Sequence, residues 1–560
     1  MAKFYRPVLR DQPFLLPPDM REWLPPDHAV WLVIGAVAGL ELPAVHRLRR
    51  RGGRGAAGYD PVMLATVLVW AYGQGVTSSR RVEGLCRTDV AFRVICAGDA
   101  PDHVTIARFR AGLGDAAGEL FTAVLVLYAR LGMGQLGTVA LDGTKIAASA
   151  SAGANRGEER LRELAGELAA AHAETDAAED ALFGAGVRGD EVPAELADPV
   201  TRQERIRAAL AGLEAERKAA QAERDAQAAE YLDAARAGSP PPGMPPALAA
   251  VAAAEIRAGR AEAAQRDRIA RREQRDARAR AAGKPGYPGR RPAAPGDHAG
   301  CRAARAALDK ARARASAEAA KAARQAGPGP VRNITDPASR LMGCKTGNGT
   351  RYSQGYNAQN MTSRDGLIIA TEHTNSPADV TWFEPMLATA ENAAALIIAH
   401  QPPGTHDTHD THDTDSSDSS DSSEERYQGP IGQVLADAGY LSGHNLTVSG
   451  PDRLIATGKR RALEKAARSG QDDDPSANEA IAAMAARLAT PAGITAYRQR
   501  GHIAETPHGH IKHNMRFRQH TMRGKTRTAA EWTLVCTVHN LFKAITTGHL
   551  TPATLAALAS

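Results

Sequence analysis

The spacing of apolar residues changes several times along the chain. The segments PVMLATVLVWAY (61–72) and ELFTAVLVLYARLG (119–132) are long enough to form buried helices, so residues 1–135 are predicted to form a helical domain. The pattern then changes in LGTVALDGTKIAAS (136–149), which predicts a strand with Asp142 at its centre. The chain thus begins with helices and passes into a sheet.

One short helix in the N-terminal region carries two arginines. In DHVTIARFRAGLG, Asp102 is placed to cap a helix on which Ile106, Phe109 and Leu113 recur at helical spacing, and Arg108 and Arg110 are predicted to project away from that apolar face. Together with the preceding segment SSRRVEGLCRTDVAFRVIC, it resembles a helix-turn-helix, whose second helix reads DNA. An ordinary helical bundle explains the same pattern equally well.

Residues 151–330 differ in composition from the segments on either side. Alanine, glutamate and arginine dominate, and leucines recur at spacings of three and four, which predicts helical hairpins or a coiled coil. Nine arginines stand against four acids between residues 257 and 280. Such a charge run is typical of a solvated helical surface, and contact with DNA phosphates is the alternative.

Strand signals return after this region. A hairpin is predicted over 352–374, and a helix over 382–400. The acidic repeats THDTHDTHDTDSSDSSDSSEE within 403–426 have no apolar residues, so this tract is expected to be a disordered linker. Its His–Asp repeats leave transition-metal binding as a second interpretation.

Two further strands and a basic region follow. IGQVLADAGYL (431–441) predicts a buried strand that ends at Asp437, and PDRLIATGK (451–459) predicts another. The rest of the chain is predicted to be helical. Residues 498–527 contain eight lysines and arginines and five histidines against a single acid, Glu505.

Composition narrows the class of protein. A chain of 560 residues is too long for one compact core, and a net charge of +6 supports nucleic-acid binding only weakly. The five cysteines are scattered, without metal-site or disulfide spacing. Because neither a run of about 20 apolar residues nor a secretory signal occurs, we expect a cytoplasmic, nucleoid-associated protein without membrane contact.

Three acids stand apart from the others. Asp142 lies within a predicted strand, Asp437 follows another, and Glu505 is alone in a basic helical segment. Phosphodiester chemistry with two divalent metals needs such isolated carboxylates on adjacent elements, because Mg²⁺ prefers few, hard oxygen ligands. By spacing alone, these three would be a weak choice among 63 acids.

Several motifs in a fixed order make the choice firmer. They are YDPVMLATVLVWAYGQGVTSSRRVEGLC, PDHVTIARFR, ALDGTKI, DPASRLM, GYNAQ, VLADAGY, AETPHGHIKHNMRFR, RGK and AEWTLVCTVHNLFK, between about residues 59 and 545. In these motifs the chain resembles bacterial insertion-sequence transposases with a DDE catalytic domain of the RNase H type. The resemblance implies an α/β RNase H-like catalytic domain with a mixed five-stranded sheet, an N-terminal all-α domain and a long α-helical insertion.

The resemblance also implies domain boundaries and catalytic residues. The N-terminal helical DNA-binding domain would span 1–135 and the catalytic domain 136–150 and 331–545, with the insertion at 151–330 and the acidic linker at 403–426. Three carboxylates would hold two Mg²⁺ or Mn²⁺ ions. They belong to Asp142 on the first strand, Asp437 at the end of the fourth strand and Glu505 on a helix.

Many relatives carry a Tyr–Arg–Glu–Lys signature around the last acid, which Tyr497, Arg500, Glu505 and Lys512 match in type. Four residues separate Arg500 from Glu505, where the common signature has three, and Thr506 replaces a common proline. The expected DNA contacts are Arg108, Arg110, Tyr497, Arg500, Lys512, Arg516, Arg518 and Arg523.

The implied function is binding of terminal inverted repeats and target DNA by a homodimer, with metal-dependent strand cleavage and strand transfer. A silent or domesticated DNA-binding descendant of a transposase is one alternative. A rolling-circle nuclease with a histidine pair is another, suggested by His508–Gly–His510. That site needs a hydrophobic residue between two histidines on a strand, so Gly509 and the predicted helix argue against it.

Overall fold

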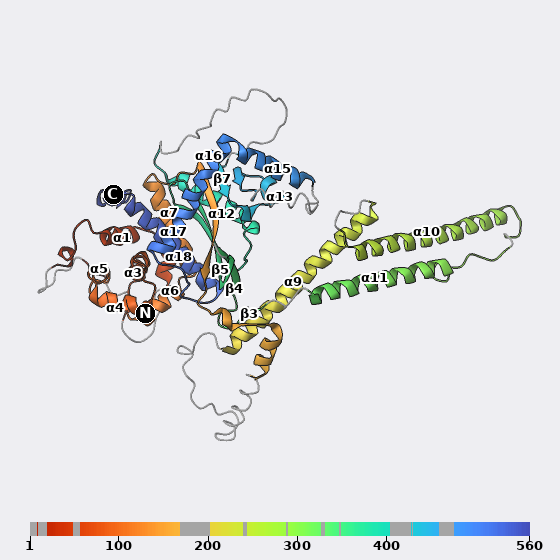
Figure 1. Ribbon diagram of the computed structural model, residues 1–560, viewed down its shortest axis with the longest axis horizontal. Coiled ribbons are helices and arrows are strands. Elements are labelled where there is room, and N and C mark those ends of the chain that lie inside the picture. Colours follow the sequence, from red (N-terminus) through yellow and green to blue (C-terminus); the bar gives the residue numbers. More distant parts are fainter. Residues whose placement is uncertain are drawn as a thin grey trace, which may run out of the picture. The chain divides into compact units, whose positions relative to one another are not determined.

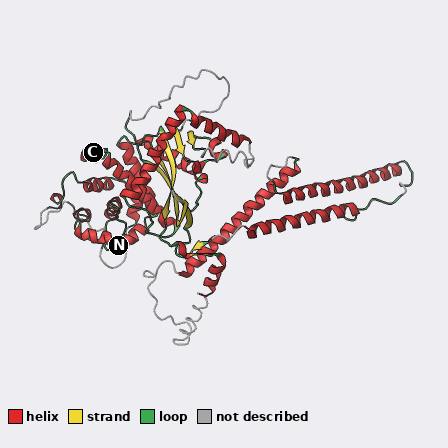
Figure 2. Cartoon of the chain, in the orientation of Figure 1, coloured by secondary structure: helices red, strands yellow, loops and turns green. Residues whose placement is uncertain are grey.

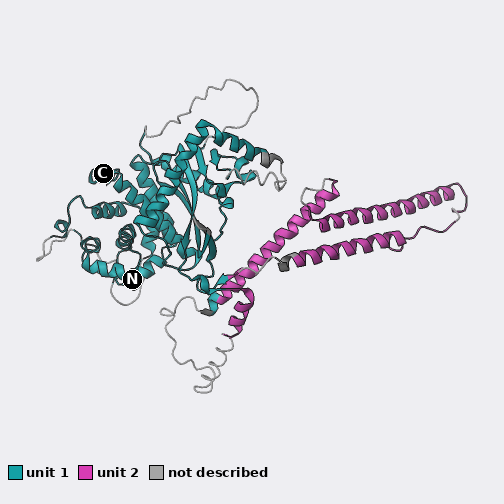
Figure 3. Cartoon of the chain, viewed as in Figure 1, with its two compact units in different colours: residues 1–155, 199–205, 332–560 teal, residues 156–198, 206–331 magenta. Residues whose placement is uncertain are grey.

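A computed structural model gives the fold (Figure 1). It divides into two compact units, residues 1–155, 199–205 and 332–560 in the first, and 156–198 and 206–331 in the second (Figure 3). The residues it describes are 8, 10, 19–48, 57–167, 202–238, 244–286, 289–325, 331–346, 349–403, 427, 429–458 and 475–559. Apart from its first residue, the predicted acidic linker lies outside these residues, and so does part of the predicted insertion. The predicted domain boundaries stay predictions.

A mixed sheet forms the centre of the first unit (Figure 2). Its strands are β1 (Thr138–Ala147), β4 (Arg340–Thr346), β5 (Gly349–Ser363), β6 (Ile368–Thr374), β7 (Gln433–Ala436) and β8 (Asp452–Ile455). β5 pairs in antiparallel fashion with β1, β4 and β6. β7 pairs in parallel with β1 on one side and with β8 on the other. The predicted strand around Asp142, the hairpin over 352–374 and the strand before Asp437 are therefore confirmed.

The sheet has six strands, so the expected number of five is wrong by one. The long strand β5 is the reason. Its Gly355 pairs with β4 on one side and β1 on the other, and its Asn357 pairs with β6 and β1 in the same way. Two strands thus follow one another along a single edge of β5, and the sheet is five positions wide.

Helices cover both faces of the sheet because its strands alternate between two apolar surfaces. Val139 and Leu141 of β1 belong to a large core shared with the N-terminal helices, whereas Ala140 belongs to a smaller cluster with Ile503 and Ala504. Asp142 follows Ala140 by two residues, so its side chain is directed to the face of the smaller cluster. On that face the cluster includes residues between Met484 and Ala504, whereas the C-terminal helices at 525–559 pack on the large core.

The large core joins the sheet to helices from both ends of the chain. α12 and α18 pack on β6, α7 packs on both of these helices, and α3 packs on α18. The helices of this layer are η1 (Met20–Glu22), α1 (Ala29–Ala38), α2 (Pro43–Arg47), α3 (Pro61–Gly73), α4 (Ser79–Thr88), α5 (Val90–Ile95), α6 (His103–Ala111), α7 (Asp115–Arg130), α12 (Phe383–His400), α18 (Lys525–Thr546) and α19 (Pro552–Ala559). The buried helices predicted at 61–72 and 119–132 are confirmed.

A nearly continuous helical run crosses the smaller cluster. It consists of α15 (Pro475–Ala489), α16 (Pro491–Arg500), the π-helical turn η5 (Gly501–Glu505), α17 (Thr506–Gly509) and a second π-helical turn, η6 (His510–Asn514). The remaining short elements of this unit and its border are η2 (Ala152–Ala154), β2 (Asn155–Arg156), β3 (Arg332–Asn333), η3 (Val380–Trp382), η4 (Ala438–Tyr440) and α13 (Gly443–Thr447).

The described part of the second unit consists mainly of long helices. They are α9 (Arg202–Arg236), α10 (Pro246–Ala281) and α11 (Ala299–Gln325). The last two form an antiparallel hairpin, because Glu255 pairs with Arg312 while Glu262 pairs with Arg305. This confirms the helical hairpin predicted from the sequence.

No single helix in the described ranges has the length and apolar character needed to cross a membrane. Taken together, α6 and α7 have that length and composition, but they form a pair bent by 80°.

Candidate active site

Two aspartates come together where β7 ends. β1 and β7 pair in parallel with Leu141 opposite Ala436, so the next residues, Asp142 and Asp437, leave this ladder at the same level. The Asp437 carboxylate also accepts a hydrogen bond of 2.9 Å from the backbone N–H of Gly439 and thereby caps η4. The register of two strands therefore brings together acids that are 295 positions apart in the sequence.

One guanidinium joins these acids to the third. Arg500 Nη2 lies 3.0 Å from Asp142 Oδ1 and 3.9 Å from Asp437 Oδ2, and Arg500 Nη1 lies 3.7 Å from Glu505 Oε1. All three predicted carboxylates thus surround a single positive charge. Their catalytic and metal-binding roles stay predictions.

A π-helical turn explains how Arg500 reaches Glu505 despite the extra residue between them. In an α-helix, residues five apart point in different directions, whereas a π-helical turn closes with an i→i+5 hydrogen bond. The turn η5 covers Gly501–Glu505, directly after Arg500. The additional residue in the signature is accommodated there, and the two side chains return to the same side.

The carboxylates differ in exposure. The Asp142 side chain is 17% exposed, against 44% for Asp437 and 68% for Glu505. Burial raises the pKa of Asp142 to about 6, with Asp437 and Glu505 adding to the increase and Arg500 opposing it. Burial together with excess negative charge is what a cation at this position would relieve.

The same helical run places two more basic side chains beside β1. His508 Nε2 lies 3.9 Å from Asp142 Oδ2, and burial, with the charges of Lys512 and Arg500, lowers the pKa of His508 to about 3. Lys512 donates a hydrogen bond from Nζ to Oγ1 of Thr144, two residues beyond Asp142. A neutral imidazole and an ammonium group therefore border the acids.

The histidine pair of the rolling-circle alternative is not arranged for metal binding. His508 and His510 lie in α17 and η6 rather than on a strand, and His510 Nδ1 lies 3.0 Å from His539 Nδ1. His508 faces Asp142 instead. The helical setting expected from the sequence is therefore confirmed.

Tyr497, the first member of the signature, supports the end of β7. Tyr497 Oη donates a hydrogen bond of 3.1 Å to the carbonyl oxygen of Ala436, the residue before Asp437. Burial raises the pKa of this tyrosine, so it remains a neutral donor. Tyr497 thus fixes the strand that positions Asp437.

The sequence did not reveal a further aspartate at the site. Asp379 accepts hydrogen bonds from Lys145 Nζ (3.1 Å), Asn357 Nδ2 (2.6 Å) and Gln359 Nε2 (2.7 Å). A Cβ atom on Gly143 would lie 2.8 Å from Asp379 Oδ1, which places this carboxylate directly beside the residue after Asp142. The motifs ALDGTKI and GYNAQ contain the partners of Asp379, but only the fold brings it to them.

The predicted DNA-contacting arginines fall into two groups. Arg108, Arg516, Arg518 and Arg523 are exposed. Arg516 adopts a positive φ of 54° directly after the helical run, and Arg518 Nε donates to the carbonyl oxygen of Lys512 at 2.9 Å. These side chains are available to a bound polyanion, and their role in DNA binding stays a prediction.

Arg110 is different, and the prediction that it projects from the apolar face is wrong. It is 7% exposed, and its Nη1 donates hydrogen bonds to the carbonyl oxygen of Thr77 at 2.5 Å and to Tyr72 Oη at 3.5 Å. The adjacent helices cover this side of α6, which helical spacing within α6 alone does not reveal. Arg110 is a structural residue of the core.

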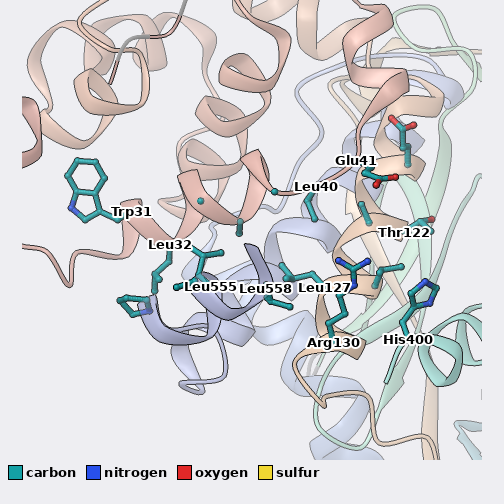
Figure 4. A pocket seen from close by; sticks show the side chains of 18 of the residues that line it. Trp31, Leu32, Leu40, Glu41, Thr122, Leu127, Arg130, His400, Leu555 and Leu558 are labelled. Carbon is teal, nitrogen blue, oxygen red and sulfur yellow. The ribbon is translucent and has the colours of Figure 1, made fainter. Parts of the chain in front are cut away.

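One cavity of the first unit lies away from the acids. It has a volume of about 840 Å³, and its lining includes Trp31, Leu32, Leu127, His400 and Leu555, from helices α1, α7, α12 and α19 (Figure 4). None of the four acids and none of the signature residues lines it. Among the three predicted acids, Asp437 and Glu505 are accessible from the surface, whereas Asp142 is mostly buried.

The donor set fits divalent magnesium or manganese in chemistry, because all three groups are carboxylates. Within the ranges that the structure describes, no three or more His, Cys, Asp or Glu side chains are spaced to hold a metal ion. The Arg500 guanidinium lies among the three acids. Binding of a cation by these acids therefore requires Arg500 to move aside.

Two family models match the chain. A transposase domain (DUF772) matches residues 18–112, and a transposase DDE domain matches residues 464–545. The chain belongs to the DDE-type insertion-sequence transposases. The DDE-domain match includes Arg500 and Glu505 of this transposase, whereas Asp142 and Asp437 lie outside both matches. No curated protein and no solved structure showed a significant match.

Proposed function

We propose that this transposase binds the ends of its insertion sequence and catalyses metal-dependent DNA cleavage and strand transfer. The convergence of Asp142, Asp437 and Glu505 on one guanidinium carries the proposal. These residues come from a strand, a strand end and a helix, and no local structure would place them together by itself. A trio of carboxylates of which two are exposed suits a reaction on a large polyanion.

The order of the strands supports an RNase H-like fold for the catalytic domain. Across the five positions of the sheet the order is β6, β5, β1, β7, β8, with β4 beside β6 along the edge of β5. Among these five strands β1 is first in the chain and β7 is fourth. Asp142 on the first and the acid directly after the fourth match the positions that this fold implies.

Asp142, Asp437 and Glu505 would hold the divalent cations. Bound there, two cations would activate an oxygen nucleophile and neutralise the charge that develops on the phosphate. In the free protein, the Arg500 guanidinium neutralises part of the charge of the acids. Once it moves aside, Arg500 would contact the phosphate backbone beside the scissile bond, as a planar guanidinium is suited to do.

Other residues would bind or position DNA around the site. Lys512, held beside Thr144, would place an ammonium group next to the reacting phosphate, where a preorganised charge is most effective. Arg516, Arg518 and Arg523 would contact phosphates without reading sequence. Recognition of the terminal repeats would lie in residues 1–135, with Arg108 on α6, and the complex would contain two copies of the chain at the nucleoid.

The decisive experiment is cleavage of a labelled duplex that carries the element's own end, with Mg²⁺ or Mn²⁺. Asp142→Asn, Asp437→Asn and Glu505→Gln should each reduce cleavage by at least about 1,000-fold, because each removes a cation ligand. Binding of the same duplex should persist in all three.

Asp452→Asn is the matched control. Asp452 lies on the neighbouring strand β8 and pairs with Arg487 at 2.5 Å, outside the trio. This variant should cleave at a rate close to that of the unaltered protein. Normal cleavage by any of the three site variants would exclude that residue from the active site, and normal cleavage by all three would refute the proposed function.

A further inference from the structure

Positive charge is concentrated in one hairpin of the second unit. Residues 246–325, which contain α10 and α11, have 19 lysines and arginines against 8 aspartates and glutamates, an excess of 11. Since the whole chain has an excess of only 6, the other 480 residues together carry a net charge of −5. The modest charge of the whole protein thus hides a strongly basic hairpin.

The arginines of α10 are ordered along the helix. Six of them form what we call the arginine stripe: Arg257, Arg260, Arg268, Arg271, Arg275 and Arg278. At about 100° per residue, these positions fall within an arc of about 80°. All six are exposed, whereas Ala254, Ala258 and Gln265 are buried on a different face of the helix.

Two of the five acids of α10 pair with its partner helix. Glu255 pairs with Arg312 at 2.8 Å and Glu262 pairs with Arg305 at 2.7 Å, both on α11 (Figure 1). Asp267 is the acid that borders the arginine stripe, and it pairs with Arg271 at 3.8 Å. Glu255 and Glu262 thus help to hold the hairpin together, and the six arginines of the stripe outnumber the one acid that borders them.

Three arginines of the stripe are the most available to a ligand. Among the described residues, Arg260, Arg268 and Arg278 have no acidic partner, and all three lie on the exposed face. Like charges at helical spacing repel one another and destabilise an isolated helix. Such an arrangement is stabilised when a polyanion binds.

We infer that the arginine stripe binds the phosphate backbone of double-stranded DNA without reading its sequence. The inference rests on the proposed function, which supplies DNA as the polyanion. From Arg257 to Arg278 the stripe spans about 32 Å at 1.5 Å per residue, close to one turn of the duplex. Arginine is the side chain best suited to contact phosphates.

The composition of the hairpin favours duplex DNA over other polyanions. Proteins that bind single strands stack the bases on aromatic side chains, and residues 246–325 contain only one aromatic residue, Tyr287. Membrane-surface helices need bulky apolar residues opposite their basic face, but the buried residues of α10 are mainly alanines. A backbone contact with duplex DNA requires neither feature.

Salt-dependent binding of a random-sequence 40-base-pair duplex tests the inference. The full chain is used with Asp142→Asn as background and without divalent cations, so that the DNA stays intact. The stripe variant combines Arg260→Gln, Arg268→Gln and Arg278→Gln. Glutamine keeps the helical propensity of arginine, so circular dichroism should be unchanged.

The matched control removes the same charge from other positions of the hairpin. It combines Arg266→Gln, Arg280→Gln and Arg314→Gln, three exposed arginines outside the stripe. Arg266 and Arg314 each pair with an acid four residues away, and Arg280 Nε donates to its own helix. Any general effect of net charge should appear equally in the two triple variants.

The stripe variant should bind roughly 100-fold more weakly at 0.1 M salt, with the slope of log K against log salt smaller by about 2 to 3, since each phosphate contact contributes about 0.9. The control should change the slope by less than about 1. Equal slopes for the stripe variant and the unaltered chain, or equal losses in both triple variants, would overturn the inference. The inference would also be overturned if the stripe variant lost binding to a single-stranded oligonucleotide or to anionic phospholipid vesicles while its duplex binding stayed unchanged.

Failure of this inference can be told apart from failure of the proposed function. The stripe variant with Asp142 intact should still cleave an end duplex at saturating protein concentration, because the acids are untouched. Unchanged salt dependence with intact cleavage would refute only the role of the stripe. Altered salt dependence together with normal cleavage by Asp142→Asn would refute only the proposed chemistry.

Discussion

Replacing Asp142 with asparagine should stabilise the metal-free protein even though it should abolish cleavage. Burial, with the charges of Asp437 and Glu505, raises the pKa of Asp142 from 3.8 to about 6. The folded state therefore binds this proton more tightly than the unfolded chain does. The resulting stability is fully present below pH 3.8 and is lost as the pH rises through 6.

The pKa sets the magnitude of the effect. At pH 7.5, where Asp142 is ionised in both states, a pKa raised from 3.8 to about 6 corresponds to a loss of about 3 kcal/mol. At pH 5 the folded protein still holds most of the proton, and the loss is only about 1.5 kcal/mol. Asparagine has no such titration, and its side-chain oxygen can still accept the hydrogen bond from Arg500. Asp142→Asn should therefore exceed the unaltered protein in stability, and more so at pH 7.5.

Urea unfolding followed by circular dichroism, with EDTA present, measures this difference at both pH values. Asp452→Asn is a control of opposite sign. Burial raises the pKa of Asp452, but hydrogen bonds from Arg487 and Gln433 outweigh burial, so this pKa is lowered overall. The ionised Asp452 side chain stabilises the fold above the pKa that it has in the unfolded chain. Asp452→Asn should therefore lower the free energy of unfolding by a similar amount at pH 5 and pH 7.5. The reasoning fails if Asp142→Asn does not stabilise at pH 7.5, or stabilises equally at both values.

Changes at Arg500, Arg110 and Arg108 test the surroundings of the acids and the N-terminal helices. Arg500→Gln should tighten Mn²⁺ binding to the DNA-free protein by at least about tenfold in calorimetry, because it removes a competing charge, whereas Arg500→Lys should change it less. Weaker binding by Arg500→Gln would contradict the position assigned to this guanidinium. Arg110→Ala should destabilise the fold by about 2–3 kcal/mol, since it leaves the carbonyl of Thr77 buried without its donor. Arg108→Ala should leave the unfolding midpoint unchanged but reduce the preference for terminal-repeat over scrambled duplex, and equal affinities in this variant and the unaltered chain would exclude Arg108 from end recognition.

The sequence by itself predicted most of the local elements and selected three acids that the fold brings together. Strand-like segments bounded by turn residues located β1, β5, β6, β7 and β8. Motif order then selected Asp142, Asp437 and Glu505 from 63 acids. It also showed an additional residue between Arg500 and Glu505, without indicating how the chain accommodates it.

Only the tertiary structure decided how these residues meet. The pairing register aligns Asp142 with Asp437, the π-helical turn η5 brings Arg500 back to Glu505, and packing places Asp379 next to Gly143. Burial of Arg110 likewise depends on neighbouring helices rather than on α6 itself. Local periodicity reports which face of an element is apolar. Which polar side chain touches which depends on strand register and helix packing between distant segments, and these are set by the whole core.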